Sequence, residues 1–284
     1  MPGHAWRVLG RELRSGELRL LFAALAIAVA AVTAVGFFAD RVRLALEREA
    51  QQMMGGDLIL IADHALPESY AADARQRGLK LAETLVFPSM VIGPVQAQLA
   101  DIKAVSPGYP LRGRVDISAL AGQAAVPAEG GPAPGSVWLD ERLSAALQVA
   151  PGGSVTVGAK TLKVAAILIR EPDRGINFFS LAPRLMMHVD DIPATGLIQP
   201  GARIRYSLLA AGEAKAVAGH QSWLAQRLER GEKLEDTRNA RPEIRGALDR
   251  AERFLGLSTV LTVVLAAVAA AMAVGPLVVA RHID

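Results

Sequence analysis

The sequence predicts an α+β protein in which two transmembrane helices extend as a helical stalk that carries a mixed α/β extracytoplasmic domain. Two apolar runs, residues 20–39 and 254–280, contain no Asp, Glu, Lys or Arg. A helix needs about 20 apolar residues to cross the hydrocarbon core of a bilayer, and both runs reach that length. Between them, residues 57–240 show short strand-like and helix-like patterns of ordinary soluble composition. Two spans place both chain ends on one side of the membrane and the domain on the other.

Composition limits the possible classes of function. The mean hydropathy of +0.28 is high for a soluble protein and low for one with many spans. The net charge of +3 is small, and the basic residues are interleaved with acids, which argues against a nucleic-acid binder. Because the chain has no cysteine, disulfides, thiolate chemistry and Cys-ligated metals are excluded.

The segment before the first run, residues 1–19, predicts an amphipathic helix at the membrane interface or a simple cytoplasmic flank. Trp6, Leu9 and Leu13 share one helical face. The segment also carries Arg7, Arg11, Arg14 and Arg19. This basic flank favours a cytoplasmic N-terminus, because positively charged segments stay on the cytoplasmic side. The charges flanking the second run point the other way, but long loops translocate largely regardless of charge, so the first helix decides the orientation. A cleaved signal peptide is the alternative, but its apolar region would be shorter, about 7–15 residues.

Helical patterns continue beyond both runs, over residues 40–56 and 241–253. Their apolar positions are Val42, Leu46, Ala50 and Met53 in the first and Ile244, Leu248, Ala251 and Leu255 in the second. Spacings of three and four residues give the narrow seam of a coiled coil, so we expect a paired stalk. The alternative is two separate amphipathic helices on the domain. Both runs are rich in alanine, which is typical of helices that pack on other helices in lipid.

Within residues 57–240 the local patterns predict the elements in order. Strands are expected at 57–62, 79–86, 95–105, 154–157, 161–169, 185–189 and 203–209, and helices at 70–78, 139–147 and 213–230. The loop at 130–135 contains several Gly and Pro residues and suggests a division into two subregions near residue 130.

One turn is a candidate binding feature. Residues 106–110 read Ser-Pro-Gly-Tyr-Pro, so Pro107, Gly108, Tyr109 and Pro110 form a rigid turn that would project an aromatic ring. The pattern favours a structural turn over an exposed contact for a ligand or partner.

Catalytic motifs are missing from the sequence. It contains no G-x-S-x-G elbow, no P-loop and no H-E-x-x-H pair. His188 with Asp190 and Asp191 is the nearest approach to a metal ligand set, although a solvated turn explains it better. The charged segment 171–174 is expected to be a solvated loop, and Phe178-Phe179 either a lipid- or partner-facing patch or a buried plug. We expect no catalytic, cofactor-binding or metal-binding residue.

Three stretches resemble a known family. They are RSGELRLLFAALAIAVAAVTAVGFFADRVRLALEREA from Arg14, VSPGYPLRGRV from Val105 and RAERFLGLSTVLTVVLAAVAAAMAV from Arg250. With the arrangement of the spans, they are similar to the N-terminal part of MacB/FtsX-type ABC transporter permeases, especially the YbbP-like branch. The resemblance covers nearly the whole chain.

The resemblance implies a permease subunit of the bacterial inner membrane that binds no cofactor itself, because ATP is held by a separate cytoplasmic ATPase. It also implies a periplasmic core domain moved through the stalk, and hydrophobic or lipid-like compounds as substrates. Expected partners are that ATPase, further permease segments or a second permease copy, and membrane lipid. The expected divisions are 1–19 cytoplasmic, 20–39 first span, 40–56 stalk, 57–240 periplasmic core, 241–253 stalk, 254–280 second span and 281–284 the start of a cytoplasmic loop. Since such permeases continue past the second span, we expect the chain to be a fragment.

Two other functions fit the same arrangement. A membrane-anchored extracytoplasmic sensor or scaffold would also need two spans and one domain. A lipid-modifying enzyme would need a nucleophile and a base close together, and no pattern in the sequence proposes such a pair.

Overall fold

The computed structural model describes residues 52–174, 182–199 and 201–236, with isolated residues between 26 and 45 and at 253, 256, 257 and 264. The chain divides into two compact units, Glu47–Ala240 and the two ends together, Met1–Leu46 with Arg241–Asp284. The described residues of the first apolar run are helical. In the part of the chain that the structure describes, no helix has the length and hydropathy needed to span a bilayer. Most of the predicted spans, 20–39 and 254–280, lies outside the described residues.

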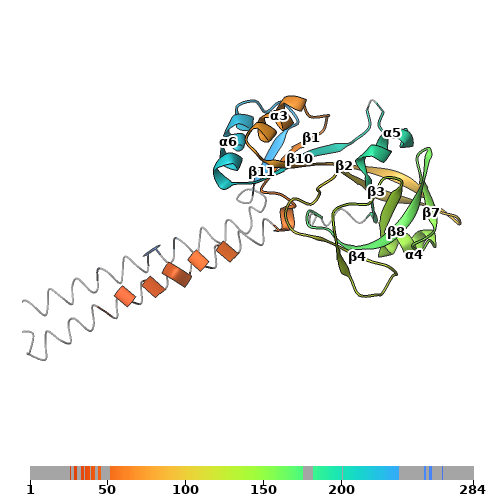
Figure 1. Ribbon diagram of the computed structural model, residues 1–284, viewed down its shortest axis with the longest axis horizontal. Coiled ribbons are helices and arrows are strands. Elements are labelled where there is room, and N and C mark those ends of the chain that lie inside the picture. The colour runs from red at the N-terminus through yellow and green to blue at the C-terminus, as the bar shows by residue number, and fades with distance from the viewer. Residues whose placement is uncertain are drawn as a thin grey trace, which may run out of the picture. The chain divides into compact units, whose positions relative to one another are not determined.

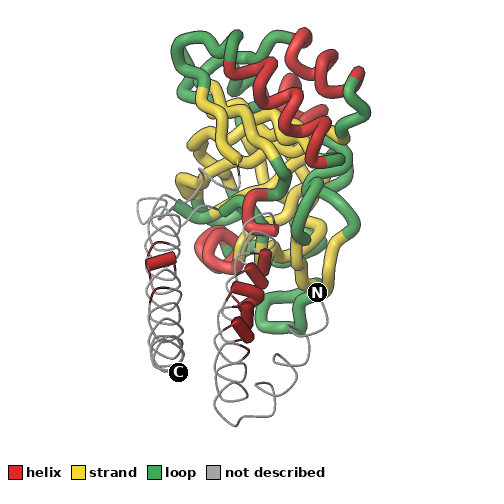
Figure 2. Tube along the Cα trace, turned by 90° about the vertical axis from the view of Figure 1, so that its left-hand side faces the viewer, coloured by secondary structure: helices red, strands yellow, loops and turns green. Residues whose placement is uncertain are grey.

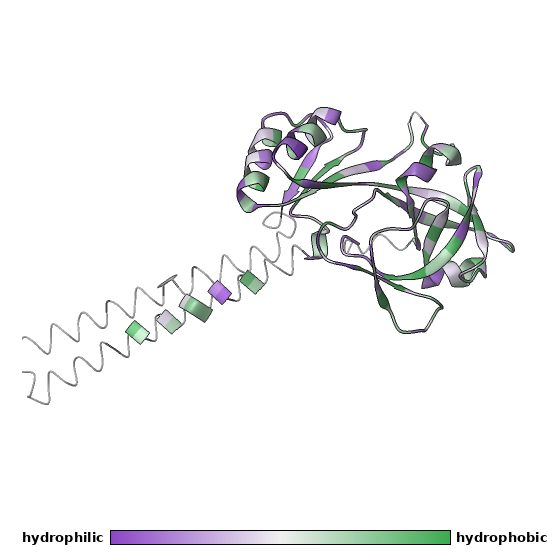
Figure 3. Cartoon of the chain, in the orientation of Figure 1, coloured by the Kyte–Doolittle hydropathy of each residue, from purple (hydrophilic) through white to green (hydrophobic). Residues whose placement is uncertain are grey.

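One part of the Glu47–Ala240 unit is a two-layer α/β lobe (Figures 1 and 2). Its strands are β11 (Lys233–Asp236), β1 (Leu58–Ala62) and β10 (Arg205–Ala211), joined by antiparallel pairing in that order. Helices α3 (Glu68–Gln76) and α6 (Ala214–Ala225) cover one face, and their buried residues pack on Leu58, Leu60 and Leu208. Both helices carry polar residues beside apolar ones (Figure 3), as expected for helices with one buried face.

The rest of the unit is built on a closed ring of strands. In ring order they are β2 (Lys80–Ile92), β3 (Ala97–Val105), β9 (Arg184–His188), β6 (Ser136–Asp140), β8 (Lys160–Arg170) and β7 (Ser154–Val157), and β7 pairs again with β2. Alternate residues of these strands point inward because side chains in a strand alternate between faces. They form the largest apolar cluster, to which α4 (Glu141–Leu147) contributes Leu143 and Leu147.

Strand β2 belongs to both parts. Its first half pairs with β10 of the lobe, and its second half pairs with β3 and β7 of the ring. A separate apolar cluster lies between the two parts and includes Ile59 and Leu209 from the lobe and Trp138 and Met186 from the outside of the ring. The lobe and the ring therefore share a continuous sheet and a buried interface.

Smaller elements complete the unit. Strands β4 (Val115–Ser118) and β5 (Val126–Ala128) extend the sheet beyond β8, and a 3-10 turn η1 (Val189–Asp191) leads into the short helix α5 (Ile192–Thr195). No boundary appears near residue 130, since β4 before it pairs with β8 after it. The helix expected at 139–147 starts at Glu141, because Asp140 ends β6 and its carboxylate accepts a hydrogen bond from the Leu143 amide at 2.8 Å.

Candidate coupling junction

The chain enters the domain through Gly55 and Gly56, between the helical residues 52–54 and strand β1. The Gly55 carbonyl accepts hydrogen bonds from the backbone amides of Leu111 (2.9 Å) and Arg112 (3.0 Å). The Arg112 guanidinium also donates two hydrogen bonds to the Asp57 carboxylate, at 2.9 and 2.8 Å. A bidentate pair of this kind adds geometric specificity to its charge. These contacts fix the start of β1 to the segment that follows the 106–110 turn.

A close backbone approach tightens the same contact. A Cβ atom at Gly113 would lie 2.2 Å from the carbonyl oxygen of Gln52, and the Gly113 φ of +73° disfavours other residues. Gly113 is therefore required where this segment crosses the end of the incoming helix.

The 106–110 turn differs from the prediction that it would project the aromatic ring of Tyr109. Pro107 and Gly108 are exposed and Pro110 is half-buried, but the Tyr109 side chain is completely buried in the cluster between lobe and ring. The expected projecting aromatic ring is thus wrong, and the structural reading of this turn is the one that fits. The Tyr109 ring anchors the turn from inside.

Beneath the turn lies a buried cluster of charges. Lys103 is 2% exposed, and its Nζ donates hydrogen bonds to Glu171 Oε2 (2.9 Å), to the Tyr109 hydroxyl (2.7 Å) and to Asp173. The Tyr109 hydroxyl donates to Asp173 in turn. The other Glu171 oxygen accepts a hydrogen bond from Arg184 Nε at 2.9 Å. The expected solvated loop at 171–174 is therefore wrong, because Glu171 is buried among these partners.

The electrostatics of this cluster follow from burial and charge. Burial alone would raise the pKa of Glu171, but the positive charges of Lys103 and Arg184 outweigh it and lower that pKa below its ordinary value. Burial, with the negative charges of Asp173 and Glu171, raises the pKa of Tyr109 well above its ordinary value. The carboxylate stays charged and the phenol stays neutral, so the cluster is a structural clamp at neutral pH.

Asp140 extends the clamp to the ring. Its Oδ2 accepts hydrogen bonds from Arg174 Nη2 and from the Arg184 amide, both at 3.0 Å, while its Oδ1 caps α4. The incoming chain, the 106–110 turn and strands β3, β6, β8 and β9 are thereby joined in one network.

The outgoing chain leaves the domain beside the incoming one. Strand β11 pairs antiparallel with β1, and Leu58 lies opposite Asp236. Residue 57, where the chain arrives, and residue 236, where the described chain departs, are therefore at the same edge of the sheet.

Of the predicted seam residues, only Met53 is described; it is helical and 37% exposed. Val42, Leu46, Ala50, Ile244, Leu248, Ala251 and Leu255 lie outside the described residues. Phe178 and Phe179 also lie outside them.

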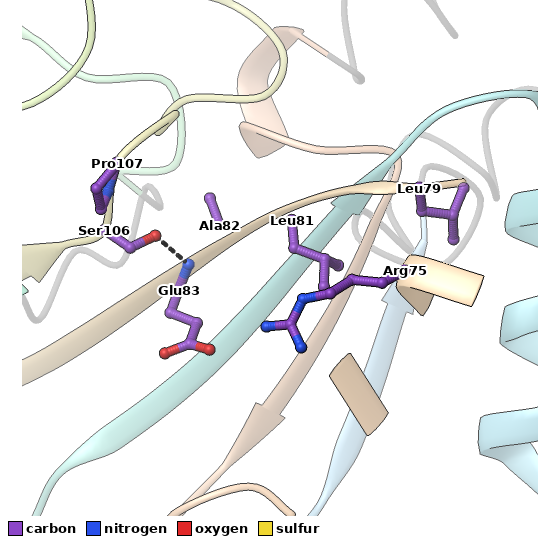
Figure 4. A pocket seen from close by; sticks show the side chains of 7 residues that line it. All are labelled: Arg75, Leu79, Leu81, Ala82, Glu83, Ser106 and Pro107. Atoms are coloured by element: carbon purple, nitrogen blue, oxygen red, sulfur yellow. Dashed lines mark hydrogen bonds between the residues drawn. The ribbon is translucent and has the colours of Figure 1, made fainter. Parts of the chain in front are cut away.

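A cavity of about 350 Å³ lies beside the turn and is lined in part by Ser106 and Pro107 (Figure 4). It is lined by Arg75, Leu79, Leu81, Ala82, Glu83, Ser106 and Pro107. The Ser106 hydroxyl accepts a hydrogen bond from the Glu83 amide at 2.7 Å, which ties the turn to β2. The lining combines one cation, one carboxylate and the Ser106 hydroxyl with aliphatic side chains.

The structure assigns other roles to the residues considered for metal. His188 Nδ1 accepts a hydrogen bond from the Asp190 amide at 3.2 Å, and Asp191 binds Lys160 Nζ (2.6 Å) and the Gly135 amide (2.8 Å). Throughout the described ranges, no group of three or more His, Asp and Glu side chains could hold a metal ion.

The buried clamp was not predicted from the sequence, although one signal pointed to it. Lys103 interrupts an otherwise apolar strand end, between Ile102 and Ala104. Lysine is almost never fully buried unless it is paired, so a lysine at this position indicates a carboxylate partner elsewhere in the sequence. The sequence alone does not say that Glu171, 68 residues later, provides it.

Comparisons with known proteins agree with the motifs. The family model for the MacB-like periplasmic core domain matches residues 20–240. A relative from Escherichia coli (strain K12), described as an uncharacterized ABC transporter permease YbbP, is 35% identical over 263 residues, which are 93% of this chain and 32% of the relative. The chain thus spans about a third of the length of that curated relative, which is named for transport and not for catalysis.

Two solved structures are also similar. The periplasmic region of MacB from Actinobacillus actinomycetemcomitans gives a TM-score of 0.39 at 11% identity, covering 66% of this chain and 92% of that chain. The extracellular domain of the noncanonic ABC-type transporter YknZ from Gram-positive bacteria gives a TM-score of 0.40 at 11% identity, covering 63% of this chain and 100% of that chain. Because the family model covers most of the sequence and the motif resemblance is confirmed by it, the chain belongs to the MacB-like periplasmic core domain family of ABC transporter permeases.

Proposed function

We propose that this chain is part of the permease subunit of an ABC transporter in the bacterial inner membrane. In this proposal the N-terminus is cytoplasmic, the Glu47–Ala240 unit is periplasmic, and a separate cytoplasmic ATPase moves that unit through the two predicted spans. The observation that carries the proposal is the adjacency of β1 and β11, which brings both connections of the domain to one edge. A domain suspended in this way can be moved as one body by paired helices.

The junction supports transmission of force. Arg112 binds Asp57 and Gly55 at the point of arrival, and Tyr109 connects this segment to the buried clamp of Lys103 and Glu171. Interiors are packed as densely as organic crystals, so displacement at one end of such a network is passed on and not absorbed. Movement of residues 52–54 would therefore move both lobe and ring.

The partners follow from the same proposal. ATP would be bound by the ATPase, and the permease would be completed by further permease segments or a second copy, within membrane lipid. Hydrophobic or lipid-like compounds are the proposed substrate class, supported by the family resemblance alone.

Association with an ATPase tests the proposal directly. The complete permease that contains this chain is co-expressed in turn with each ABC ATPase of the source genome, purified in lipid nanodiscs and assayed with and without ATP. Retention of one ATPase together with an increase in its ATP turnover is expected. If no ATPase is retained in any nucleotide state, the coupling proposal is wrong and a sensor or scaffold becomes the better reading.

Topology is tested separately. The chain has no cysteine, so a single Gln76→Cys variant offers one thiol on the exposed end of α3. A membrane-impermeant maleimide should label it in intact cells with a permeabilised outer membrane. Labelling only after lysis would place the domain in the cytoplasm and contradict the proposed orientation.

A further inference from the structure

The outgoing strand is held at its start by an acid–base pair. Glu232 directly precedes β11, and its side chain is completely buried. Its Oε2 accepts hydrogen bonds from the Glu229 amide (2.8 Å) and from the Tyr70 hydroxyl (3.2 Å). Its Oε1 is buried and accepts no hydrogen bond from the described residues. The nearest cation for that oxygen is the imidazole of His64, whose Nε2 lies 3.4 Å away.

The imidazole stands between two carboxylates. Nδ1 of His64 lies 2.9 Å from Asp63 Oδ1, and Nε2 faces Glu232 Oε1. A neutral imidazole has one N–H, so it leaves a nitrogen lone pair facing one of these oxygens. Only the doubly protonated ring presents an N–H to each carboxylate. The geometry therefore favours the imidazolium.

We propose that His64 is a proton-operated latch: when protonated it pairs with the buried Glu232 and holds the start of β11 against the loop that follows β1, and when neutral it releases that strand. This goes beyond the proposed transport function and does not depend on it. The latch acts on a weak element, because β11 has four residues and pairs only with β1 in the described part of the chain.

The carboxylates around the His64 imidazole favour its protonated form. The hydrogen bond to Asp63, with the charges of Asp63 and Glu232, raises the pKa of His64 despite some desolvation. Tyr70 from α3 is neutral, Glu229 adds negative charge, and Arg227 stacks over the Trp223 ring 4.3 Å from its centroid. Because the pKa of the folded state is raised, the stabilisation is complete below the unfolded histidine pKa and is lost as pH rises through the folded pKa.

Loss of the proton has a local consequence. Nδ1 lies at hydrogen-bond distance from Asp63, 2.9 Å, whereas Nε2 lies 3.4 Å from Glu232, so the neutral ring is expected to keep its N–H on Nδ1. Nε2 then turns a lone pair toward Glu232 Oε1, and that buried, charged oxygen is left without a donor, which is strongly unfavourable. The Glu232 carboxylate can avoid this cost by turning outward to solvent. That movement breaks its hydrogen bonds with the Glu229 amide and the Tyr70 hydroxyl, which shape the turn before β11. The expected result is faster opening of residues 228–236, while the closed ring of strands that contains β9 is unchanged.

Hydrogen exchange of the full-length chain in nanodiscs tests the latch. Protection of peptides within 228–236 is compared at about pH 5.5 and about pH 8, on either side of an ordinary histidine pKa, after correction for intrinsic exchange. Protection should fall about tenfold at the higher pH, near the lower end of the effect expected when a buried charged group loses its partner. Peptides from strand β9 serve as the internal reference.

Two variants have opposite expected results. His64→Leu should give low protection at both pH values, because the buried carboxylate has no donor at either. Glu232→Gln should give higher protection than His64→Leu at the higher pH and a weaker pH response than the wild type, because a neutral amide leaves no buried charge for the imidazole to compensate. His188→Gln, a histidine on the ring side of the unit, should keep the wild-type response.

Several results would overturn the latch. They are a pH response in His64→Leu equal to that of the wild type, protection in Glu232→Gln as low as in His64→Leu, or no pH response in the wild type. A response shared equally by the β9 peptides would show general opening and would also refute it. None of these measurements requires an ATPase, so failure here is distinguishable from failure of the transport proposal.

Discussion

The buried clamp makes a quantitative prediction for Lys103→Met. Methionine is similar in length to lysine and apolar, so the change removes the charge with little change in volume. Lys103 is 2% exposed and gives hydrogen bonds to three acceptors. After the change, the Glu171 carboxylate would remain completely buried with Arg184 as its main cation.

The expected loss of stability depends on the partners that Glu171 and Asp173 keep after the change. Removing one partner of a buried ion pair costs about 3–5 kcal/mol. Arg184 still donates to Glu171 at 2.9 Å, and the 18% exposed side chain of Asp173 can reach water, so the lower end applies. We expect a loss of about 3 kcal/mol, or about 6–12 °C in the melting temperature for a unit of this size.

Urea unfolding of the full-length chain in detergent provides the measurement, with Trp138 fluorescence as the probe because this residue lies in the cluster between lobe and ring. The exposed Lys163 on β8 is the matched control, and Lys163→Met should change stability by less than about 0.5 kcal/mol. The difference caused by Lys103→Met should shrink below about pH 4, because protonation then removes the buried charge of Glu171. A loss under about 1 kcal/mol at neutral pH would refute the reasoning that Lys103 compensates the buried charge of Glu171.

Three further changes test the surrounding contacts. Gly113→Ala should destabilise the unit by about 1–3 kcal/mol more than Gly78→Ala, measured by urea unfolding; both glycines have positive φ, but only Gly113 has a backbone oxygen within 4 Å of the added Cβ. Tyr109→Phe should cost about 1–3 kcal/mol in the same assay, because the change removes a hydroxyl that both accepts and donates a hydrogen bond in the clamp. The hydrogen bond from Arg77 lowers the pKa of Asp73, so stability should fall as pH drops below about 4, and a pH titration of Asp73→Asn should show a smaller fall.

Local patterns in the sequence predicted the elements that carry their own signal. The hairpin around residues 158–160 was placed to within a residue at either end, because a Gly-containing turn separates two alternating segments. Strand β1 was found because Gly55 and Gly56 mark its start. The short strands β4, β5, β6 and β11 were not predicted.

The features that local patterns did not predict depend on contacts between residues far apart in the sequence. The segment 171–174 has the composition of a solvated loop, and nothing within it indicates burial. Its burial depends on Lys103 and Arg184, which lie on strands brought together only by the parallel pairing of β3 and β9. The same holds for Tyr109, whose burial requires the lobe and the ring to close over it from both sides.

The two connections of the domain are not equivalent, and this has a mechanical consequence. The incoming side is fixed by Arg112 to Asp57, by the close approach of Gly113 and by a buried charged network that reaches the ring. The outgoing side, as far as residue 236, is a four-residue strand at the sheet edge, held by its pairing with β1, by a hydrogen bond from Gln221 to Asp236 and by the His64–Glu232 pair. Edge strands with few contacts open at lower free energy than central ones. If the proposed paired helices pull on the domain, the outgoing strand is the connection expected to yield first, and the latch proposed at His64 would change how firmly that strand is held.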